Sequence, residues 1–257
     1  MNTKPVDSQH YSKDYYYNDN DGHKEFEQGL DFAMHGKFKR FFDIVNPVKG
    51  QKILDIGCGR GEIAYYSAQR GCEVYSVDYS SAAVEIAKKT LEKLSAEKKN
   101  LVKVECLDII EAEIKEKFDI VALIDVLEHL TPRQAEKLFM NFKDLVTDKS
   151  KVFISTPNGF YEQYLYIFKH MIQYPWKPFK ILWRLSWGKF KPKGFKEFFK
   201  KAFSLLPESS ENIELMHVNV MTPLAIKKLL KKNGFKVKFY QGNNFIDKEI
   251  VVVGKRI

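Results

Sequence analysis

The sequence holds few cysteines and no long apolar run. Only three cysteines, Cys58, Cys72 and Cys106, occur among 257 residues, and their spacing matches no metal site. We therefore expect buried free thiols in a reducing compartment. No apolar run is long enough to span a bilayer, and the polar start lacks the apolar core of a signal peptide. These absences predict a cytoplasmic protein. Its 257 residues are enough to bury one substantial core.

The stretch that organises the chain is K-I-L-D-I-G-C-G-R-G at 52–61. A short apolar strand is followed by three glycines at alternate positions, and residues 62–70 have a helical pattern. A loop between a strand's carboxyl end and a helix's amino end is where open α/β sheets bind nucleotide-like ligands. The spacing G-x-G-x-G, preceded by an acid at Asp55, differs from the dinucleotide fingerprint G-x-G-x-x-G, and by itself the loop could also be a structural turn of another α/β protein.

Strands alternate with helices along the rest of the chain, which indicates a doubly wound parallel sheet. A helix packed beside the sheet is predicted from Glu25 to Val45 because its apolar residues recur at helical spacing. The last two strands are joined by a short loop at 242–244, which predicts a hairpin and one reversed strand. After the strand of the glycine run, strands are expected at 73–78, 101–107, 118–124, 152–155, 235–241 and 249–253.

Acidic side chains follow two of these strands. Asp78 ends the strand at 73–78, about 20 residues after the glycines, where a carboxylate can accept hydrogen bonds from ribose hydroxyls. Asp108 follows the strand at 101–107. Because both acids would lie at the same edge of the sheet as the glycine loop, they predict an adenosine-type ligand.

The run L-D-I-G-C-G-R-G resembles the first motif of class I S-adenosylmethionine-dependent methyltransferases, and the resemblance covers roughly 48–158 and 216–257. It implies a Rossmann-like, doubly wound α/β sheet of seven strands with one antiparallel strand, and S-adenosylmethionine as methyl donor. In that family the positions of Asp78, Asp108 and Tyr79 contact the ribose, the adenine amino group and the adenine ring. The full set implied for the donor is Asp55, Gly57, Cys58, Gly59, Asp78, Tyr79, Asp108, Ile109 and Asp125.

Candidates for the chemistry follow the strand at 118–124. Asp125, Glu128 and His129 stand within five residues, and His217 could approach them in space. Carboxylates with imidazoles suit a divalent cation such as Mg²⁺. The spacing resembles that of ubiquinone-biosynthesis and small-RNA 2′-O-methyltransferases, although their first acid is Glu and here it is Asp125. Two interpretations stay open: a metal held by these four residues, or a metal-free site with His129 or His217 as general base.

Most of the formal charge of +9 comes from one segment. Residues 160–206 hold ten Lys or Arg against two Glu, together with 15 of the 36 aromatic residues. A mostly helical insert is predicted at 159–213, a lid or substrate-binding subdomain between the core segments 46–158 and 214–257. Three uses of 160–206 stay open: peripheral contact with an anionic membrane, a nucleic-acid platform, or a subdomain with its own aromatic core.

The N-terminal segment has two interpretations. Residues 1–21 are polar and contain three consecutive tyrosines at 15–17, so they form either a loosely ordered tail or a segment folded over the cofactor. In the second case residues 1–45 cover the cofactor site, with a tyrosine hydroxyl near the ligand. We expect an S-adenosylmethionine-dependent methyltransferase that acts, at oxygen, on a small molecule with an apolar or aromatic part. The alternatives are an RNA methyltransferase and a non-catalytic binding module; the oligomeric state is not predicted.

Overall fold

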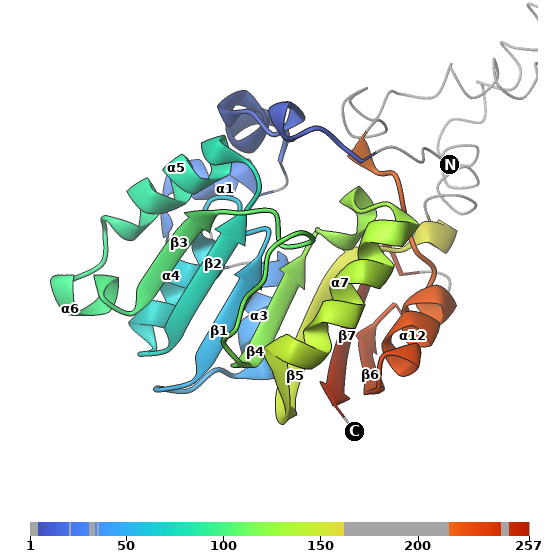
Figure 1. Cartoon of the computed structure of the whole chain (residues 1–257). Coiled ribbons are helices and arrows are strands. Elements are labelled where there is room, and N and C mark those ends of the chain that lie inside the picture. The colour runs from blue at the N-terminus through green and yellow to red at the C-terminus, as the bar shows by residue number, and fades with distance from the viewer. Residues whose placement is uncertain are drawn as a thin grey trace, which may run out of the picture.

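The computed structural model describes residues 5–20, 22–30, 34, 36–161, 216–242 and 247–256. Within these ranges the chain forms a seven-stranded sheet in the order β3-β2-β1-β4-β5-β7-β6 (Figure 1). The strands are β1 Lys52–Ile56, β2 Glu73–Asp78, β3 Val102–Cys106, β4 Phe118–Ile124, β5 Val146–Pro157, β6 Phe235–Gln241 and β7 Glu249–Arg256. Nearly all of the predicted insert at 159–213 lies outside the described residues, so its fold and its three candidate uses stay predictions.

Strand direction follows the predicted pattern. β1 to β5 pair in parallel, whereas β7 runs antiparallel to both β5 and β6. The prediction of a seven-stranded, doubly wound sheet with one reversed strand is therefore confirmed. The parallel strands all end at the same edge, which is the upper edge in Figure 1.

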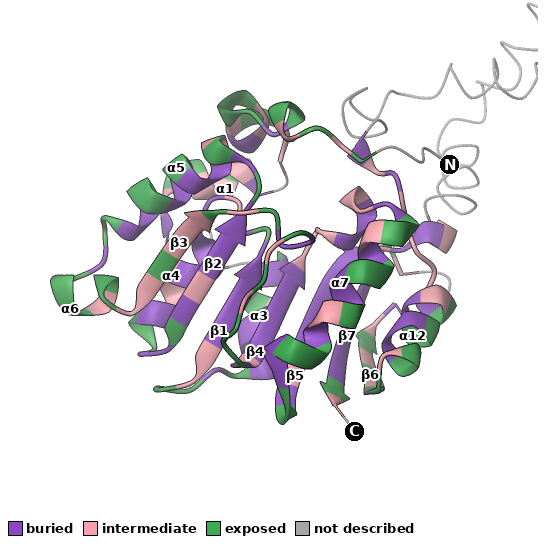
Figure 2. Cartoon of the chain, in the orientation of Figure 1, coloured by how far each residue is buried: buried purple, intermediate pink, exposed green. Residues whose placement is uncertain are grey.

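Helices cover both faces of the sheet. Side chains alternate along each strand, so Leu54 packs in the core under α7 and α12, whereas Ile53 packs in the core under α3 and α4. Both faces of the central strands are therefore buried, and the helices expose their outer sides (Figure 2). The helices are α1 His23–Gln28, α3 Gly36–Val45, α4 Glu62–Gln69, α5 Ser81–Leu91, α6 Ala96–Lys99, α7 Pro132–Leu145 and α12 Pro223–Lys232, with short turns η1 Ser8–His10, η2 Tyr15–Asp19 and η3 Leu127–His129.

The N-terminal region departs from the prediction of one helix over Glu25–Val45. α1 ends at Gln28 because Gly29 takes a backbone φ of 122°, outside the helical range, and α3 begins only at Gly36. Before α1, residues 5–20 form a segment that we call the cap, which contains η1 and η2. The cap lies across the edge where the parallel strands end (Figure 1).

The cysteines are free, and two of the three are buried as expected. Cys106 is exposed, contrary to the prediction, because it ends β3, the strand at the edge of the sheet. None of the helices in the described ranges is long and apolar enough to cross a bilayer.

Candidate functional site

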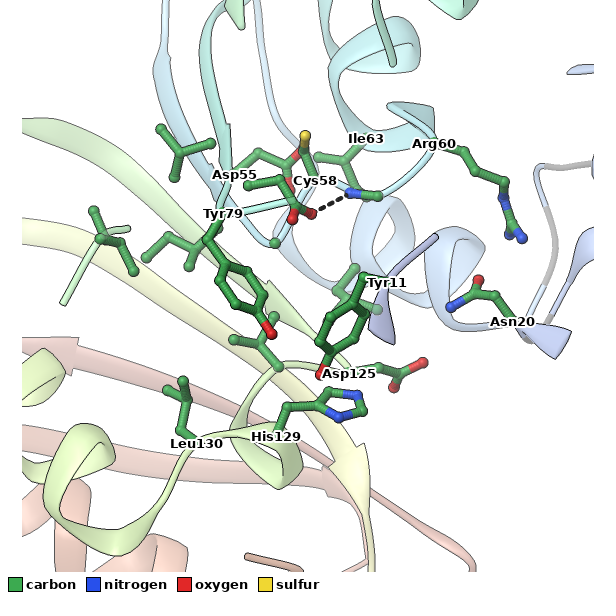
Figure 3. Close-up of a pocket in the computed structure, with 18 of the residues that line it drawn as sticks. Tyr11, Asn20, Asp55, Cys58, Arg60, Ile63, Tyr79, Asp125, His129 and Leu130 are labelled. Atoms are coloured by element: carbon green, nitrogen blue, oxygen red, sulfur yellow. Dashed lines mark hydrogen bonds between the residues drawn. The ribbon is translucent and has the colours of Figure 1, made fainter. Parts of the chain in front are cut away.

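A cavity of about 330 Å³ opens at the carboxyl ends of β1, β2 and β4, beneath the cap. The geometry brings together every residue that the sequence suggested for cofactor binding: Asp55, Gly57, Cys58, Gly59, Asp78, Tyr79, Asp108, Ile109 and Asp125 all line it. His129, suggested for catalysis and for metal binding, lines the cavity as well, whereas His217, suggested for both roles, and Glu128, suggested as a metal ligand, are not among its lining residues. Figure 3 shows Asp55, Cys58, Tyr79, Asp125 and His129 around this cavity.

The glycine loop passes so close to other backbone and side chains that side chains are excluded from it. Gly57 has a φ of 70°, and a Cβ atom there would stand 2.6 Å from Cγ2 of Val126. Gly61, the N-cap of α4, has a φ of 86°, and its Cβ would stand 3.1 Å from Cα of Ala87. These positions therefore require glycine, and the loop leaves bare backbone facing the cavity.

Two buried carboxylates lie near this loop, Asp55 in β1 and Asp78 at the end of β2. The Asp78 carboxylate accepts hydrogen bonds from the backbone N–H groups of Gly59 (3.0 Å) and Ser80 (2.9 Å), which lock its orientation. Burial raises the pKa of Asp78, while the backbone donors act against this rise. Asp55 accepts from the Ser76 hydroxyl at 3.2 Å, and burial raises its pKa to about 7. A carboxylate has about four acceptor positions, so Asp78 can still accept from a ligand.

Asp108 differs from these two because it is exposed at the rim of the cavity. Its carboxylate accepts a hydrogen bond from the Ile110 backbone N–H at 2.9 Å, which fixes the turn after β3. Ile109, next to it, is buried in the cavity wall. A carboxylate at the rim, beside an apolar wall, can accept a hydrogen bond from a polar group at the edge of a flat ligand.

Asp125 is paired with a cation that the sequence reasoning missed. Its carboxylate forms an ion pair with the ammonium group of Lys37, a buried residue of α3 that also lines the cavity. Asp125 itself has a φ of 53°, the left-handed conformation that few non-glycine residues adopt. No motif points to Lys37, because the sequence separates it from Asp125 by 88 positions.

The remaining candidate metal ligands lie close together, and one of them, His129, belongs to the cavity wall. Ligand atoms of Glu128, His129 and His217 all lie within 4.8 Å of one another. This set has one carboxylate and two imidazoles, whereas Mg²⁺ takes an octahedral set of oxygen ligands and imidazoles suit zinc and other transition metals. With the ammonium of Lys37 on Asp125, the four predicted residues do not fit a Mg²⁺ site.

His129 is oriented by a backbone acceptor. Its Nδ1 lies 3.1 Å from the carbonyl oxygen of Met216, so Nδ1 carries the hydrogen and Nε2 keeps a free lone pair. Burial, with the neighbouring His217, lowers the pKa of His129 to about 4. Glu128 accepts from the Thr156 hydroxyl at 2.9 Å, and burial raises its pKa to about 8. The imidazole is therefore neutral near pH 7 and can accept a proton at Nε2.

The cap covers the cavity through specific contacts, whereas the sequence suggested only, as one of two interpretations, that an N-terminal segment folds over the cofactor. The buried Arg60 of the glycine loop donates a hydrogen bond to the Tyr16 carbonyl oxygen at 3.2 Å, and Ser80 donates to the Tyr11 carbonyl oxygen at 2.7 Å. Tyr11, Tyr15 and Tyr16 all line the cavity. The tyrosine run at 15–17 could point to part of this wall, but nothing in the sequence singles out Tyr11.

Comparison with known proteins finds one family across most of the chain. The profile of the methyltransferase domain matches residues 32–238. A ubiquinone biosynthesis O-methyltransferase of Coxiella burnetii is 32% identical over 143 residues, 51% of this chain and 58% of that protein. One from Bradyrhizobium sp. is 36% identical over 96 residues, 37% of this chain and 36% of that protein. The chain thus spans less than two thirds of these curated relatives.

A solved structure has the same fold at low sequence identity. Magnesium protoporphyrin IX methyltransferase from Synechocystis PCC 6803, with bound SAH, superposes with a TM-score of 0.56 at 19% identity. The match covers 94% of this chain and 91% of that one, so the two chains share one arrangement of strands and helices.

Proposed function

Because the chain belongs to the methyltransferase-domain family and has the class I fold of S-adenosylmethionine-dependent enzymes, we propose that it methylates an oxygen atom of a small molecule with an apolar or aromatic part. The observation that carries this proposal is the buried Asp78 carboxylate, held by backbone donors beside the glycine loop. A carboxylate so fixed suits the two ribose hydroxyls of the methyl donor.

The rest of the donor would follow the cavity wall. Asp108 at the rim and the Tyr79 ring would hold the adenine, and the glycine loop would hold the amino-acid end. The donor supplies a methyl group on a positively charged sulfur, ready for in-line displacement. The protein then has to align the acceptor oxygen with that methyl group and accept its proton.

His129 is the group that would accept this proton. Its Nε2 lone pair is left free by the Nδ1 contact with Met216, and the ring lines the cavity. His217 packs edge-on against it, with ring centroids 5.2 Å apart, and supports its orientation. We propose a reaction that does not use Mg²⁺, since the donor set around Glu128 has two imidazoles and one carboxylate where Mg²⁺ takes oxygen ligands.

Relatives named for ubiquinone biosynthesis support oxygen as the acceptor atom, although they extend beyond the matched region. The test is to incubate the protein with S-adenosylmethionine carrying a deuterated methyl group and a panel of hydroxylated aromatic and aliphatic compounds. Mass spectrometry should find labelled methyl ethers and S-adenosylhomocysteine. Products labelled only at nitrogen or carbon would contradict the proposal.

Two further arms examine the chemistry. Removal of Mg²⁺ by chelation should leave the rate unchanged, and a lost rate restored by Mg²⁺ would overturn this part of the proposal. The substitution His129→Asn should lower kcat by about 10²- to 10⁴-fold. Its affinity for S-adenosylhomocysteine should stay close to that of the wild type, which separates a lost base from a collapsed site.

A further inference from the structure

Tyr11 is held firmly by its backbone inside the cap. Its N–H donates to the Ser8 carbonyl oxygen at 3.1 Å, and its own carbonyl oxygen accepts from the Ser80 hydroxyl at 2.7 Å. Ser80 caps α5, so this contact ties the cap to the framework of the sheet. Only 6% of Tyr11 is exposed. The position of its ring is therefore set by the fold.

The Tyr11 ring lies between the two ends of the cavity. It packs edge-on against Tyr79, with centroids 5.3 Å apart, and against His129, with centroids 5.5 Å apart. Tyr79 is at the adenine side and His129 is at the chemical side of the proposed site. Figure 3 shows the Tyr11 side chain reaching from the cap toward the His129 ring. In the proposed site, its hydroxyl would therefore face the space where the acceptor molecule meets the methyl group.

The Tyr11 hydroxyl is buried without a hydrogen-bond partner in the part of the chain that the structure describes. Burial, and then the nearby Tyr79, raise the pKa of the Tyr11 hydroxyl, so it stays a protonated donor, and the tyrosine hydroxyls beside it have partners of their own. The Tyr79 hydroxyl donates to the Val6 carbonyl oxygen at 3.3 Å, and the Tyr15 hydroxyl accepts from Asn20 at 3.3 Å. A buried hydroxyl without a partner costs about 1–3 kcal/mol. Such a cost in the wall of a cavity indicates a group that a ligand completes.

Resting on the proposed function, we propose that Tyr11 binds the methyl acceptor by donating a hydrogen bond to the oxygen that receives the methyl group. The sulfonium centre offers no good acceptor for this donor, and the ribose and carboxylate of the methyl donor belong at Asp78 and the glycine loop. The acceptor oxygen is the polar atom that remains at this end.

The step balances without any further reactant. The acceptor O–H proton passes to Nε2 of His129, and the oxygen forms a bond to the methyl carbon. The carbon–sulfur bond breaks with its electron pair going to sulfur, which leaves S-adenosylhomocysteine. Tyr11 keeps its proton throughout and stabilises the negative charge that develops on the acceptor oxygen.

The experiment uses 4-nitrophenol, a simple hydroxyarene whose absorption spectrum reports its ionisation. It is titrated into the full chain saturated with S-adenosylhomocysteine, for the wild type, Tyr11→Phe and Tyr17→Phe. Tyr17 packs against the same cap cluster as Tyr11 but does not line the cavity, so it is the matched control. Calorimetry measures the affinity of each variant for S-adenosylhomocysteine.

We expect Tyr11→Phe to bind 4-nitrophenol about 10- to 100-fold more weakly, the effect of losing a hydrogen bond to a charged oxygen. The bound probe should also ionise at a pH higher by about one unit, which a purely structural role would not produce. Tyr17→Phe should match the wild type, and all three should bind S-adenosylhomocysteine equally.

Three results would overturn the role of Tyr11: wild-type binding of 4-nitrophenol by Tyr11→Phe, equal losses in the two variants, or no binding of the probe by the loaded wild type. In each of these the proposed function survives if S-adenosylhomocysteine still binds. Failure of the wild type to bind S-adenosylhomocysteine would instead contradict the proposed function.

Discussion

Arg60, inside the glycine loop, offers the sharpest test of how the cap is held. Its side chain is 2% exposed, and its Nε donates to the Glu62 carboxylate at 2.7 Å, itself 3% exposed. Its Nη1 donates to the Tyr16 carbonyl oxygen, and its guanidinium lies 5.1 Å from the centre of the Phe26 ring. One buried cation therefore joins the loop, the cap and α1.

The magnitude follows from what the substitution Arg60→Met leaves behind. The Glu62 carboxylate would stay buried without its cation, which costs about 3–5 kcal/mol. The lost bond to Tyr16 adds about 1 kcal/mol. The double variant Arg60→Met/Glu62→Gln removes the unpaired charge, so it should regain about 2–3 kcal/mol relative to the single variant.

Urea denaturation followed by circular dichroism measures the free energy of unfolding. It is applied to the wild type, Arg60→Met, Glu62→Gln and the double variant. We expect the double variant to lose much less stability than the sum of the two single losses, which is a strong coupling between positions 60 and 62. A loss below about 1 kcal/mol for Arg60→Met would refute it, because that size is typical of exposed ion pairs. Additive losses in the double variant would refute it equally.

Three other substitutions have expected outcomes. Gly57→Ala should weaken S-adenosylhomocysteine binding at least about tenfold by calorimetry, because its Cβ would collide with Val126 at a positive φ; unchanged affinity would contradict the close approach. Glu128→Gln should raise the melting temperature at pH 8 but not at pH 4. Burial raises the Glu128 pKa to about 8, so between pH 4 and pH 8 the unfolded chain loses this proton before the folded chain does, and the stability of the wild type falls as the pH rises. Lys37→Met should destabilise the fold by roughly 1–3 kcal/mol because it leaves the Asp125 carboxylate without its cation, and adding Asp125→Asn should recover part of that loss; additive losses in the double variant would argue against the ion pair.

The fold and the cofactor edge could be predicted because their signals are local. Strand periodicity, the glycine spacing and an acid at a strand end each lie within a few residues, and parallel strands bring such ends to one edge. Asp55, Gly57 and Asp78 therefore meet where the sequence implied. The two-part N-terminal helix was missed because Gly29 and Gly36 sit inside an apolar pattern of helical period.

The rest of the site depends on contacts between distant segments, which no short pattern carries. Lys37 reaches Asp125 across 88 positions, and Tyr11 reaches His129 only because the cap folds back over the sheet. The metal prediction came from the spacing of Asp125, Glu128 and His129. That spacing says nothing of the cation that Lys37 places on the first of these residues.

We propose that this cavity binds S-adenosylmethionine through the Asp78 carboxylate. Titration calorimetry with S-adenosylhomocysteine compares the wild type with the near-isosteric Asp78→Asn. We expect one binding site in the wild type and an affinity about 10- to 100-fold lower in the variant, the effect of losing charge-assisted hydrogen bonds. No binding by the wild type, or equal affinity in the two proteins, would contradict it.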